Sequence, residues 1–431
     1  MMNAKLRRFV RIKQLHTIIS QQTIKPSSPT PPRLRTHMLS MADQILPNCH
    51  ISLLFFYQNY NNCDIEILKN SLARSLTHYY PFAGRFLTPF ANHIDCNDQG
   101  VVFLEASNDS QLNDYIIKKD QDELLQQLIP NGLGFTPNKT SPSMMQVQLN
   151  HFKCGAAALA VTISHKVGDV LTMVEFVNHW ATVTRGGSPI NPTFLPHSFI
   201  SNDKVPEFYK VRGKNRVTYV ARRFVFSNLK LNELKNKINA MGTTKINPTR
   251  VESLTSLIFR CAVDAAAMKC GSFQPSNLIQ VVDMRKKFSV PLPKVVAGNL
   301  AIGVVAMIMD SSQIELNRVI TSLRNEMNVL DRVKNVKEIG EKMANAMLML
   351  VNDESRSYSF SSLCWIPFYE VDFGWGKPVR SVAISGKMDG NFVHLMDTPL
   401  ADGIEVMGQL EQEEMAIFVK NKELVAYAQD I

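Results

Sequence analysis

The sequence predicts a mixed α/β fold in two domains of similar size. Predicted strands and helices alternate in both halves of the chain, and such alternation is typical of α/β architectures. The length of 431 residues suits two or three domains, each large enough to bury a core. A polar, proline-rich stretch at 189–216 is the best linker candidate. We therefore expect an N-terminal domain at 1–190, a connecting loop at 191–216 and a C-terminal domain at 217–431.

The N-terminal half begins with an extended segment, because four prolines fall within residues 25–40 and proline cannot sit inside a helix. Apolar residues then recur with the periods of strands and helices. The expected elements are a strand at 51–57, a helix at 65–77, strands at 100–105, 145–152 and 155–164, and a helix from Val170 that stops at Gly186-Gly187.

The C-terminal half repeats the alternation of strands and helices. Thr249 is the expected N-cap of its longest helix, because a threonine side chain can accept the first free backbone N–H groups. The expected elements are a strand at 217–226, helices at 230–241 and 249–270, strands at 277–283 and 300–309, helices at 315–330 and 336–350, short strands beyond about residue 360, and a helix from Glu411.

The net charge of +9 is concentrated at the start of the chain. Residues 1–42 hold eight basic side chains and no acidic one, which leaves basic and acidic residues almost equal in number in the rest. The main body therefore does not predict a nucleic-acid-binding surface. The first residues are either a solvated arm that leads into the first strand or an organelle transit peptide.

Cysteine content and hydropathy indicate the cellular compartment in which the protein is expected. Seven cysteines without a CxxC pair indicate reduced thiols, rather than a disulfide framework or a zinc site. No apolar run reaches the roughly 18 residues of a membrane span, and the start lacks the apolar core of a secretory signal. We expect a cytoplasmic protein that does not enter a membrane.

The segment His165-Lys-Val-Gly-Asp169 lies where a predicted apolar strand ends and an amphipathic helix begins. A histidine at such a junction can face a cleft while the strand holds its backbone. Its unperturbed pKa of about 6.5 suits it to take a proton near neutral pH, and a positioned base contributes about 10²–10⁴-fold in rate. An isolated HxxxD also arises often by chance, so a structural histidine stays an alternative.

Three other chemistries can be weighed at this segment. A metal pair of His165 and Asp169 has no HExxH motif or CxxC to complete the ligand set. A serine hydrolase needs the GxSxG elbow, which is absent. Cys154 could be a thiol nucleophile beside His165, although its apolar surroundings favour a buried structural cysteine. A base that activates the substrate's own nucleophile remains.

The chain resembles the plant acyl-CoA-dependent acyltransferases of the BAHD type, whose signatures are HxxxD and DFGWG. Here they read His165-Lys-Val-Gly-Asp169 and Asp372-Phe373-Gly374-Trp375-Gly376. The resemblance runs from about residue 16 and is greatest to the alkaloid branch of the family. Further matching segments are LSMADQ at 39–44, LTHYYPFAGR at 76–85, TRVESLTSLI at 249–258 and FYEVDFGWGKP at 368–378.

The resemblance implies two similar-sized chloramphenicol-acetyltransferase-like domains with mixed β-sheets and a channel between them, joined by a crossover loop. His165 and Asp169 are the predicted catalytic residues. His165 would be the general base, and Asp169 would pair with Arg285 and hold the loop that carries His165. The DFGWG motif would shape the domain interface and the CoA channel. Asp372 would give structural support, Gly374 and Gly376 would permit a turn, and Trp375 would pack. Lys286, Lys287 and Asn299 are the candidate CoA contacts.

Several positions depart from the pattern of the family. Relatives carry CGG where this chain has Cys154-Gly155-Ala156, and FGN where it has Ala297-Gly298-Asn299. Alkaloid-branch relatives read SWCR where this chain has Ser362-Leu363-Cys364-Trp365, which removes an aromatic residue and an arginine near the expected pocket. Asp283 replaces an asparagine beside Arg285.

The resemblance implies that an acyl group moves from acyl-CoA to a hydroxyl of a plant specialised metabolite. Acetyl is the leading acyl group, and a monoterpenoid indole alkaloid is the leading acceptor. Alternatives are a malonyl- or aromatic-acyl-CoA donor, or a catalytically silent homologue that binds alkaloid or CoA. The expected partners are acyl-CoA and a small-molecule acceptor alcohol, with no metal, prosthetic group, nucleic acid or membrane, and the expected state is a monomer.

Overall fold

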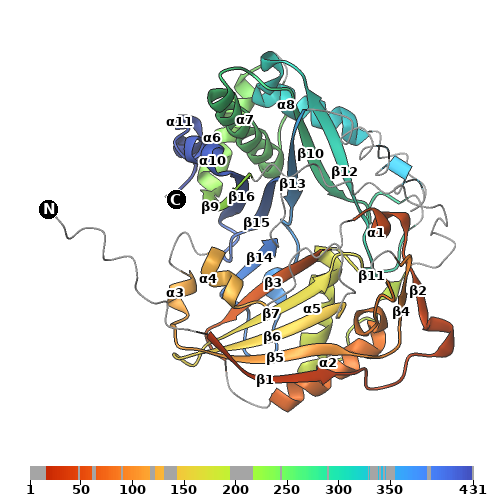
Figure 1. Cartoon of the computed structure of the whole chain (residues 1–431). Coiled ribbons are helices and arrows are strands. Elements are labelled where there is room, and N and C mark those ends of the chain that lie inside the picture. Colours follow the sequence, from red (N-terminus) through yellow and green to blue (C-terminus); the bar gives the residue numbers. More distant parts are fainter. Residues whose placement is uncertain are drawn as a thin grey trace.

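The computed structural model describes residues 16–46, 49–60, 65–88, 91–116, 122–130, 143–194, 217–242, 245–288, 291–328, 355–385 and 390–429, with single residues 330, 338, 341, 342 and 345. The arm at 1–15, the loop at 195–216 and most of the helix predicted at 336–350 lie outside the described residues. Two six-stranded sheets form the centres of two lobes (Figure 1). The predicted mixed α/β class is confirmed.

The first sheet mixes parallel and antiparallel pairs, with β5 and β6 parallel and its other neighbours antiparallel. Its strands lie in the order β1 (His16–Ile24), β5 (Val101–Asn108), β6 (Met145–Phe152), β7 (Ala157–Ser164), β3 (His50–Tyr57) and β14 (Arg380–Ser385). Helices α2 (Ile65–His78) and α5 (Val170–Thr184) pack together on one face. Short helices α3 (Asn113–Ile116) and α4 (Asp122–Gln127) contribute to a smaller core on the other face.

The second sheet runs β12 (Ala301–Ile308), β10 (Ser276–Asp283), β13 (Arg356–Ser362), β15 (Asn391–Asp397), β16 (Gly403–Glu411) and β9 (Tyr219–Ser227). Strands β10, β13 and β15 are parallel neighbours, so their carboxyl ends lie at the same edge. The helices of this lobe gather on one side of the sheet (Figure 1). They are α6 (Asn228–Ala240), α7 (Arg250–Cys270), α8 (Leu316–Asn328), α10 (Gln412–Phe418) and α11 (Lys422–Tyr427).

Local chemistry explains where the longest helix begins and ends. Thr249 and Glu252 form a capping box in which each side chain accepts from the other residue's backbone N–H, as expected of a helix start. Gly271 ends α7 with φ of 77°, a left-handed conformation that glycine adopts without a Cβ clash. The predicted N-cap at Thr249 is confirmed.

The sequence analysis missed the first strand. We predicted no strand before residue 51, but β1 pairs antiparallel with β5 along the edge of the sheet. Most residues of β1 are exposed, including Ile18 and Ile19, so the buried alternation that usually marks a strand is weak here. Pairing with a distant strand, rather than local pattern, makes this segment a strand.

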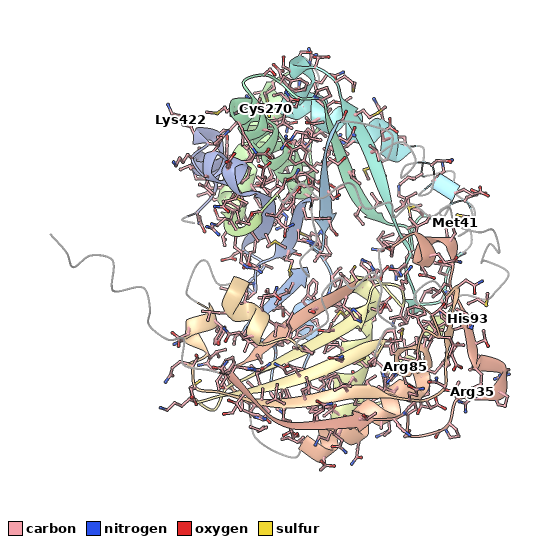
Figure 2. The ribbon with its side chains drawn as sticks, viewed as in Figure 1. Arg35, Met41, Arg85, His93, Cys270 and Lys422 are labelled. Atoms are coloured by element: carbon pink, nitrogen blue, oxygen red, sulfur yellow. The ribbon has the colours of Figure 1, made fainter. Side chains whose placement is uncertain are left out.

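Helix α1 (Met41–Ile45) ties the N-terminal segment to the second lobe. Met41, Ala42 and Ile45 pack with a small cluster that includes Met284 and Ile302 of the C-terminal half. Figure 2 shows Met41 between the lobes. The short pairs β2 (Thr36–Met38) with β4 (His93–Asp95), and β8 (Thr193–Phe194) with β11 (Val296–Ala297), add further links, the second between the two halves of the sequence.

The C-terminal half also supplies a strand to the first sheet. We predicted residues 217–431 as one domain, but β14 leaves the second lobe and pairs antiparallel with β3. Just before it, the Asp372 carboxylate accepts hydrogen bonds from the backbone N–H groups of Gly374 (2.7 Å) and Gly376 (2.9 Å), which closes a tight turn. Both glycines have φ near +90°, so the turn requires them.

The turn buries Trp375 in the core of the first lobe. The indole lies edge-on to Tyr57, with ring centroids 5.2 Å apart, and to Tyr60, at 4.9 Å. Phe373 of the same motif packs against Trp180 of α5 at 4.8 Å. DFGWG therefore joins the two halves of the chain through aromatic packing, as predicted for Trp375. Among the described residues, no helix is long and apolar enough to cross a membrane.

Replacing Trp375 with Ala is expected to lower the free energy of unfolding by about 3–5 kcal/mol, because it empties an aromatic core site. Chemical denaturation followed by near-UV circular dichroism measures this change. The matched variant Trp365→Ala removes an indole that is 81% exposed, so its stability should stay close to that of the wild type. Equal stability of both variants would contradict the anchoring role.

Candidate active site

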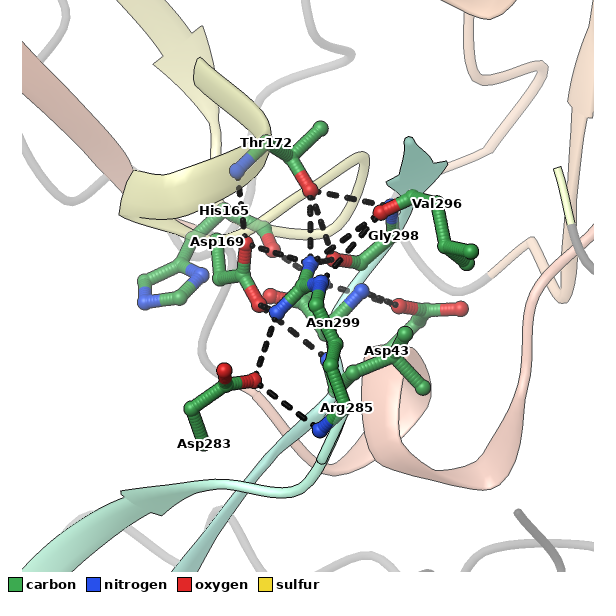
Figure 3. Close-up of polar contacts among 10 residues, drawn as sticks. Asp43, His165, Asp169, Thr172, Asp283, Arg285, Val296, Gly298 and Asn299 are labelled. Atoms are coloured by element: carbon green, nitrogen blue, oxygen red, sulfur yellow. Dashed lines mark hydrogen bonds and ion pairs between the residues drawn. The ribbon is translucent and has the colours of Figure 1, made fainter. Parts of the chain in front are cut away.

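His165 lies directly after β7, in the short loop that leads into α5. Its backbone N–H donates to the carbonyl of Cys49 (2.8 Å) beside the start of β3. The side chain is partly buried, and Figure 3 shows the imidazole turned away from the ion-pair network around Arg285. The loop thus holds the histidine backbone while leaving the ring outside that network.

Asp169 is the partner of Arg285, as predicted, and it is also the N-cap of α5. Its Oδ1 accepts from the backbone N–H of Thr172 (2.9 Å). Arg285 binds both carboxylate oxygens, with Nη1 to Oδ2 at 2.9 Å and Nη2 to Oδ1 at 3.0 Å. Such bidentate pairs are among the strongest charge-assisted hydrogen bonds. The carboxylate is therefore fully committed to holding the loop and does not face His165 as a proton relay.

The charges of this pair stabilise each other. Burial alone would raise the pKa of Asp169, but the guanidinium of Arg285 outweighs burial and holds that pKa below its usual range. Burial likewise acts to lower the pKa of Arg285, and the charge of Asp169 raises it overall. Asp283 accepts a further bond from Arg285 Nη1 (2.9 Å), so this departure from the family pattern lies inside the same network.

The segment just before β12 also binds the loop that carries His165. Thr172 Oγ1 donates to the carbonyl of Gly298 (2.9 Å), and Arg285 Nη2 donates to the same oxygen (3.1 Å). The backbone N–H of Leu300 reaches Asp169 Oδ2 (3.2 Å). Residues 298–300 of the second lobe therefore bind the start of α5 in the first (Figure 3).

Asn299 lies beside His165 rather than on an open surface. Its side chain is buried and donates to the carbonyl of His165 (2.7 Å) and to Asp43 Oδ1 (2.8 Å). We predicted this residue as a CoA contact, but both donors of its amide bind protein atoms. Of the other two predicted CoA contacts, Lys286 is exposed and Lys287 is half-buried, in the turn after β10. Their role with CoA stays a prediction.

Burial lowers the pKa of His165 below its ordinary value, although its own carbonyl, Asp169 and Asn299 act in the opposite direction. Its Nδ1 is enclosed and has no hydrogen-bond partner among the described residues. The ring is therefore neutral at neutral pH. A neutral imidazole can accept a proton, which a general base requires.

His394 lies on the face of the second sheet that is opposite the helices of its lobe. Along β15, Val393 and Leu395 join the core under the helices, whereas Met396 packs into the core of the first lobe. Alternation along a strand places His394 on the same face as Met396. Burial and the charges of Arg223 and His165 lower its pKa to about 4, which places it within electrostatic reach of His165.

The sequence analysis missed His394. Its signal was a polar residue in the otherwise apolar run Phe392-Val-His-Leu-Met396. That pattern alone did not show that the strand would face His165, because the two segments are more than 200 residues apart in the chain. A partly buried histidine within a sheet is common, and only the tertiary arrangement singles this one out.

Cys154 does not support a thiol mechanism. It lies in the turn before β7, whereas His165 follows the other end of this eight-residue strand. A strand of that length spans roughly 26 Å. Cys154 is also exposed, contrary to the predicted buried cysteine. Among the described residues, no group of three or more His, Cys, Asp or Glu side chains is arranged to hold a metal ion.

Residues 362–365, which replace the SWCR of alkaloid-branch relatives, have side chains in both lobes. Leu363 joins the core of the first lobe and Cys364 that of the second. Trp365 is exposed, with its backbone N–H bound to Asp397 Oδ2 (2.8 Å) and the Arg250 guanidinium 5.2 Å from its ring centroid. The substituted indole therefore lies at the surface and does not fill a core position.

Comparison with known proteins agrees with this architecture. A model of the Transferase family matches residues 15–425. The chain belongs to the BAHD acyltransferase family. It is 34% identical to stemmadenine O-acetyltransferase of Catharanthus roseus, over 93% of this chain and 95% of the relative. It is 31% identical to 17,18-epoxy-17-hydroxycur-19-ene N-malonyltransferase of Strychnos nux-vomica, over 95% and 90%.

The crystal structure of vinorine synthase has the same fold, with a TM-score of 0.80 and 30% identity over 96% of this chain and 98% of that one. The protein is thus an acyl-CoA-dependent O-acyltransferase, and acyl-CoA is its co-substrate. The two family signatures occupy distinct places in this acyltransferase. HxxxD forms the loop at the lobe boundary, and DFGWG forms the turn that leads into β14.

Replacing Asp169 with Ala is expected to destabilise the acyltransferase by up to about 3–5 kcal/mol, because the buried guanidinium of Arg285 then keeps only the more exposed Asp283 as a carboxylate partner. Thermal and chemical unfolding measure the loss. The double variant Asp169→Ala/Arg285→Ala should recover part of it, since the unpaired charge is gone. Fully additive losses would argue against direct coupling.

The acid limb of the pH profile for kcat/KM should have its midpoint below pH 6.5, the ordinary pKa of histidine. Burial disfavours the imidazolium, so the neutral base persists to lower pH than a solvated histidine would. Steady-state rates from pH 4.5 to 8.5, with stability checked at each pH, measure the midpoint. A midpoint above pH 7 would contradict this assignment.

Proposed function

We propose that His165 is the general base of an O-acetyltransferase that acts on a hydroxyl of an alkaloid. The observation that carries the base assignment is an imidazole whose pKa is lowered by burial, on a loop held by Arg285 and Asn299 of the other lobe. A base of this kind needs a fixed direction and a free nitrogen. Nδ1 is the enclosed nitrogen, which leaves Nε2 for the substrate.

The reaction needs no covalent acyl-enzyme. Nε2 of His165 accepts the proton of the acceptor hydroxyl as the oxygen attacks the thioester carbonyl of acetyl-CoA. The C–S bond then breaks, the ester forms, and the imidazolium returns the proton to the departing CoA thiolate. His165 ends in its starting state, so one alcohol and one acetyl-CoA yield one acetate ester and one CoA.

The names of relatives support the choice of substrates. Stemmadenine O-acetyltransferase, 34% identical, names both an acetyl group and an alkaloid. The second candidate donor is malonyl-CoA, because the Strychnos nux-vomica relative, 31% identical, is named as an N-malonyltransferase. Trp365 replaces the arginine of alkaloid-branch relatives, but its indole is 81% exposed at the surface, so this replacement does not favour either donor.

Replacing His165 with Ala is expected to lower the transfer rate by about 10²–10⁴-fold without changing the fold, because only the base is lost. The assay supplies acetyl-CoA with a panel of alkaloid alcohols that includes stemmadenine, and detects esters by mass. The control is His151→Ala, a partly buried histidine near Tyr60 at the far part of the first sheet. Retained turnover in His165→Ala would overturn the base assignment.

The same assay decides the donor. Equal concentrations of acetyl-CoA and malonyl-CoA compete for one acceptor, and the product masses differ by the carboxyl group. A predominantly malonylated product would replace acetyl with the second candidate. Binding of CoA without product across the whole panel of donors and acceptors would indicate a catalytically silent homologue.

We also propose that the protein is a cytoplasmic monomer. The absence of CxxC pairs among its seven cysteines supports a reducing compartment. A fluorescent fusion at the C-terminus, which leaves the basic arm free, tests the location. An organellar signal would show that residues 1–15 act as a transit peptide, and light scattering tests the monomer.

A further inference from the structure

Two residues with strained backbones, Trp365 and Ala401, lie close together beside the end of β15. Trp365 has φ of 70° and Ala401 has φ of 54°, values that residues other than glycine seldom adopt. Trp365 is 81% exposed and Leu400, which precedes Ala401, is 83% exposed, and these are the two most exposed large apolar side chains among the described residues. Strain of this kind persists only where surrounding contacts hold it, and it is common at ligand-binding sites.

A chain of hydrogen bonds holds these residues in place. Asp397 accepts the backbone N–H of Trp365 through Oδ2 (2.8 Å) and Nη2 of Arg250 through Oδ1 (3.1 Å). Nη1 of Arg250 donates to Asn228 Oδ1 (2.9 Å), and Asn228 Nδ2 donates to the carbonyl of Ala401 (3.0 Å). The strained conformations are therefore fixed by side chains from β15, α7 and α6.

The guanidinium of Arg250 also covers part of the Trp365 indole, because its central carbon lies 5.2 Å from the ring centroid. This cation–π attraction favours one orientation of the ring. The rest of the indole is open to solvent, since the side chain is 81% exposed. An aromatic side chain that is already ordered loses little conformational entropy when a second ring stacks on it. The indole is therefore suited to binding a planar ring.

Trp365 leaves the second sheet at the same edge as Arg285. In the parallel pair of β10 and β13, Val281 lies opposite Ser361, and Arg285 and Trp365 each follow four residues later. Neighbouring strands of a sheet are only about 4.8 Å apart. Arg285 in turn binds the loop that carries the proposed base. Trp365 therefore lies on the side of the second lobe that contributes to the site.

The segment around Trp365 also contacts the first lobe. Leu363 and Phe368, on either side of it, pack in the core of that lobe. The carbonyl of Pro367 accepts from Asn178 Nδ2 of α5 (3.4 Å). This helix begins at the HxxxD motif. The indole is thus held at the boundary between the lobes, where the proposed base also lies.

We propose that Trp365 is an acceptor-binding residue whose indole stacks on the planar aromatic ring of the acceptor. This inference rests on the proposed function and names the part of the acceptor that is recognised. The leading acceptor class, the monoterpenoid indole alkaloids, carries such a ring. Stacking removes two apolar faces from water and adds the attraction between the two ring systems.

Coenzyme A also carries a planar ring, its adenine, but the identity of residue 365 favours the acceptor. CoA is the co-substrate that the family shares, whereas the names of two relatives give stemmadenine and 17,18-epoxy-17-hydroxycur-19-ene as acceptors. Trp365 stands where alkaloid-branch relatives have arginine. A residue that differs from the relatives fits the substrate that varies among them better than the substrate that they share.

Replacing Trp365 with Ala tests the proposal. With an alkaloid alcohol that the wild type esterifies, we expect the KM for the acceptor to rise about tenfold, because one stacked aromatic pair is lost. The kcat and the KM for acetyl-CoA should change less than about twofold, because the indole does not touch the reacting atoms. Trp365→Phe keeps a ring and should recover most of the loss, whereas Trp365→Leu keeps only the apolar bulk and should not.

The matched control is Met268→Ala. Met268 is 72% exposed and lies on α7, as Arg250 does, so its truncation removes a similarly exposed apolar side chain from the same lobe. It follows Arg250 by eighteen residues, which is roughly 27 Å along the helix. All kinetic parameters of this variant should equal those of the wild type.

A binding measurement without turnover tests the same contact. The chain has three tryptophans, and Trp180 and Trp375 are buried. Labelling with 5-fluorotryptophan therefore gives one ¹⁹F resonance from an exposed indole, which Trp365→Phe assigns. Titration with the alkaloid alcohols of the transfer panel, stemmadenine included, should shift this resonance and leave the other two in place. Titration with CoA alone should leave all three in place.

The outcomes separate this proposal from the proposed function. An unchanged acceptor KM in Trp365→Ala, or a Trp365 resonance that stays in place with an alcohol that is esterified, would overturn acceptor binding at this residue. A higher KM for acetyl-CoA, or a resonance that moves with CoA alone, would overturn it in favour of an adenine contact. If no alcohol of the panel is esterified, the proposed function fails, and the ¹⁹F titration still decides ring binding at Trp365 because it needs no turnover.

Discussion

The bidentate ion pair between Asp169 and Arg285 is the interaction on which the arrangement of the site depends. It joins the first turn of α5 in one lobe to the turn after β10 in the other. Both groups are largely withdrawn from water, so each charge compensates for the burial of the other. Because Asp169 also caps α5, one carboxylate fixes the start of the helix, the domain contact and the loop that carries His165.

Because other residues hold the loop, the imidazole of His165 is left to act on the substrate. Asp169 is saturated by Arg285, Thr172 and Leu300, and Asn299 takes the carbonyl of His165. All of these contacts hold the backbone or the far side of the loop, and Figure 3 shows the imidazole outside the network. Burial then keeps the ring neutral by lowering its pKa. Burial and nearby positive charge lower the pKa of His394 on β15 to about 4, so this imidazole is neutral as well.

Local patterns predicted most of the secondary structure and the residues of both signatures. Thr249 caps α7 and Asp169 pairs with Arg285 as expected, and Trp375 packs where a buried aromatic was predicted. The failures share a cause. β1 is an exposed edge strand that exists only through pairing with β5, and β14 belongs to the sheet of the other lobe. Neither fact is encoded in a short window of sequence, because both depend on partners far along the chain.

By itself, the sequence determined the α/β class, the family signatures and the identity of the base candidate, because hydrophobic period, helix caps and motif spacing are local properties. Only the tertiary structure decided which residues surround that base. Asn299 became a neighbour of His165 and Asp43 through hydrogen bonds between segments more than 100 residues apart, and His394 came within electrostatic reach of His165. The physical reason is that hydrogen bonds and charges act over a few ångströms in space, whatever the separation in sequence.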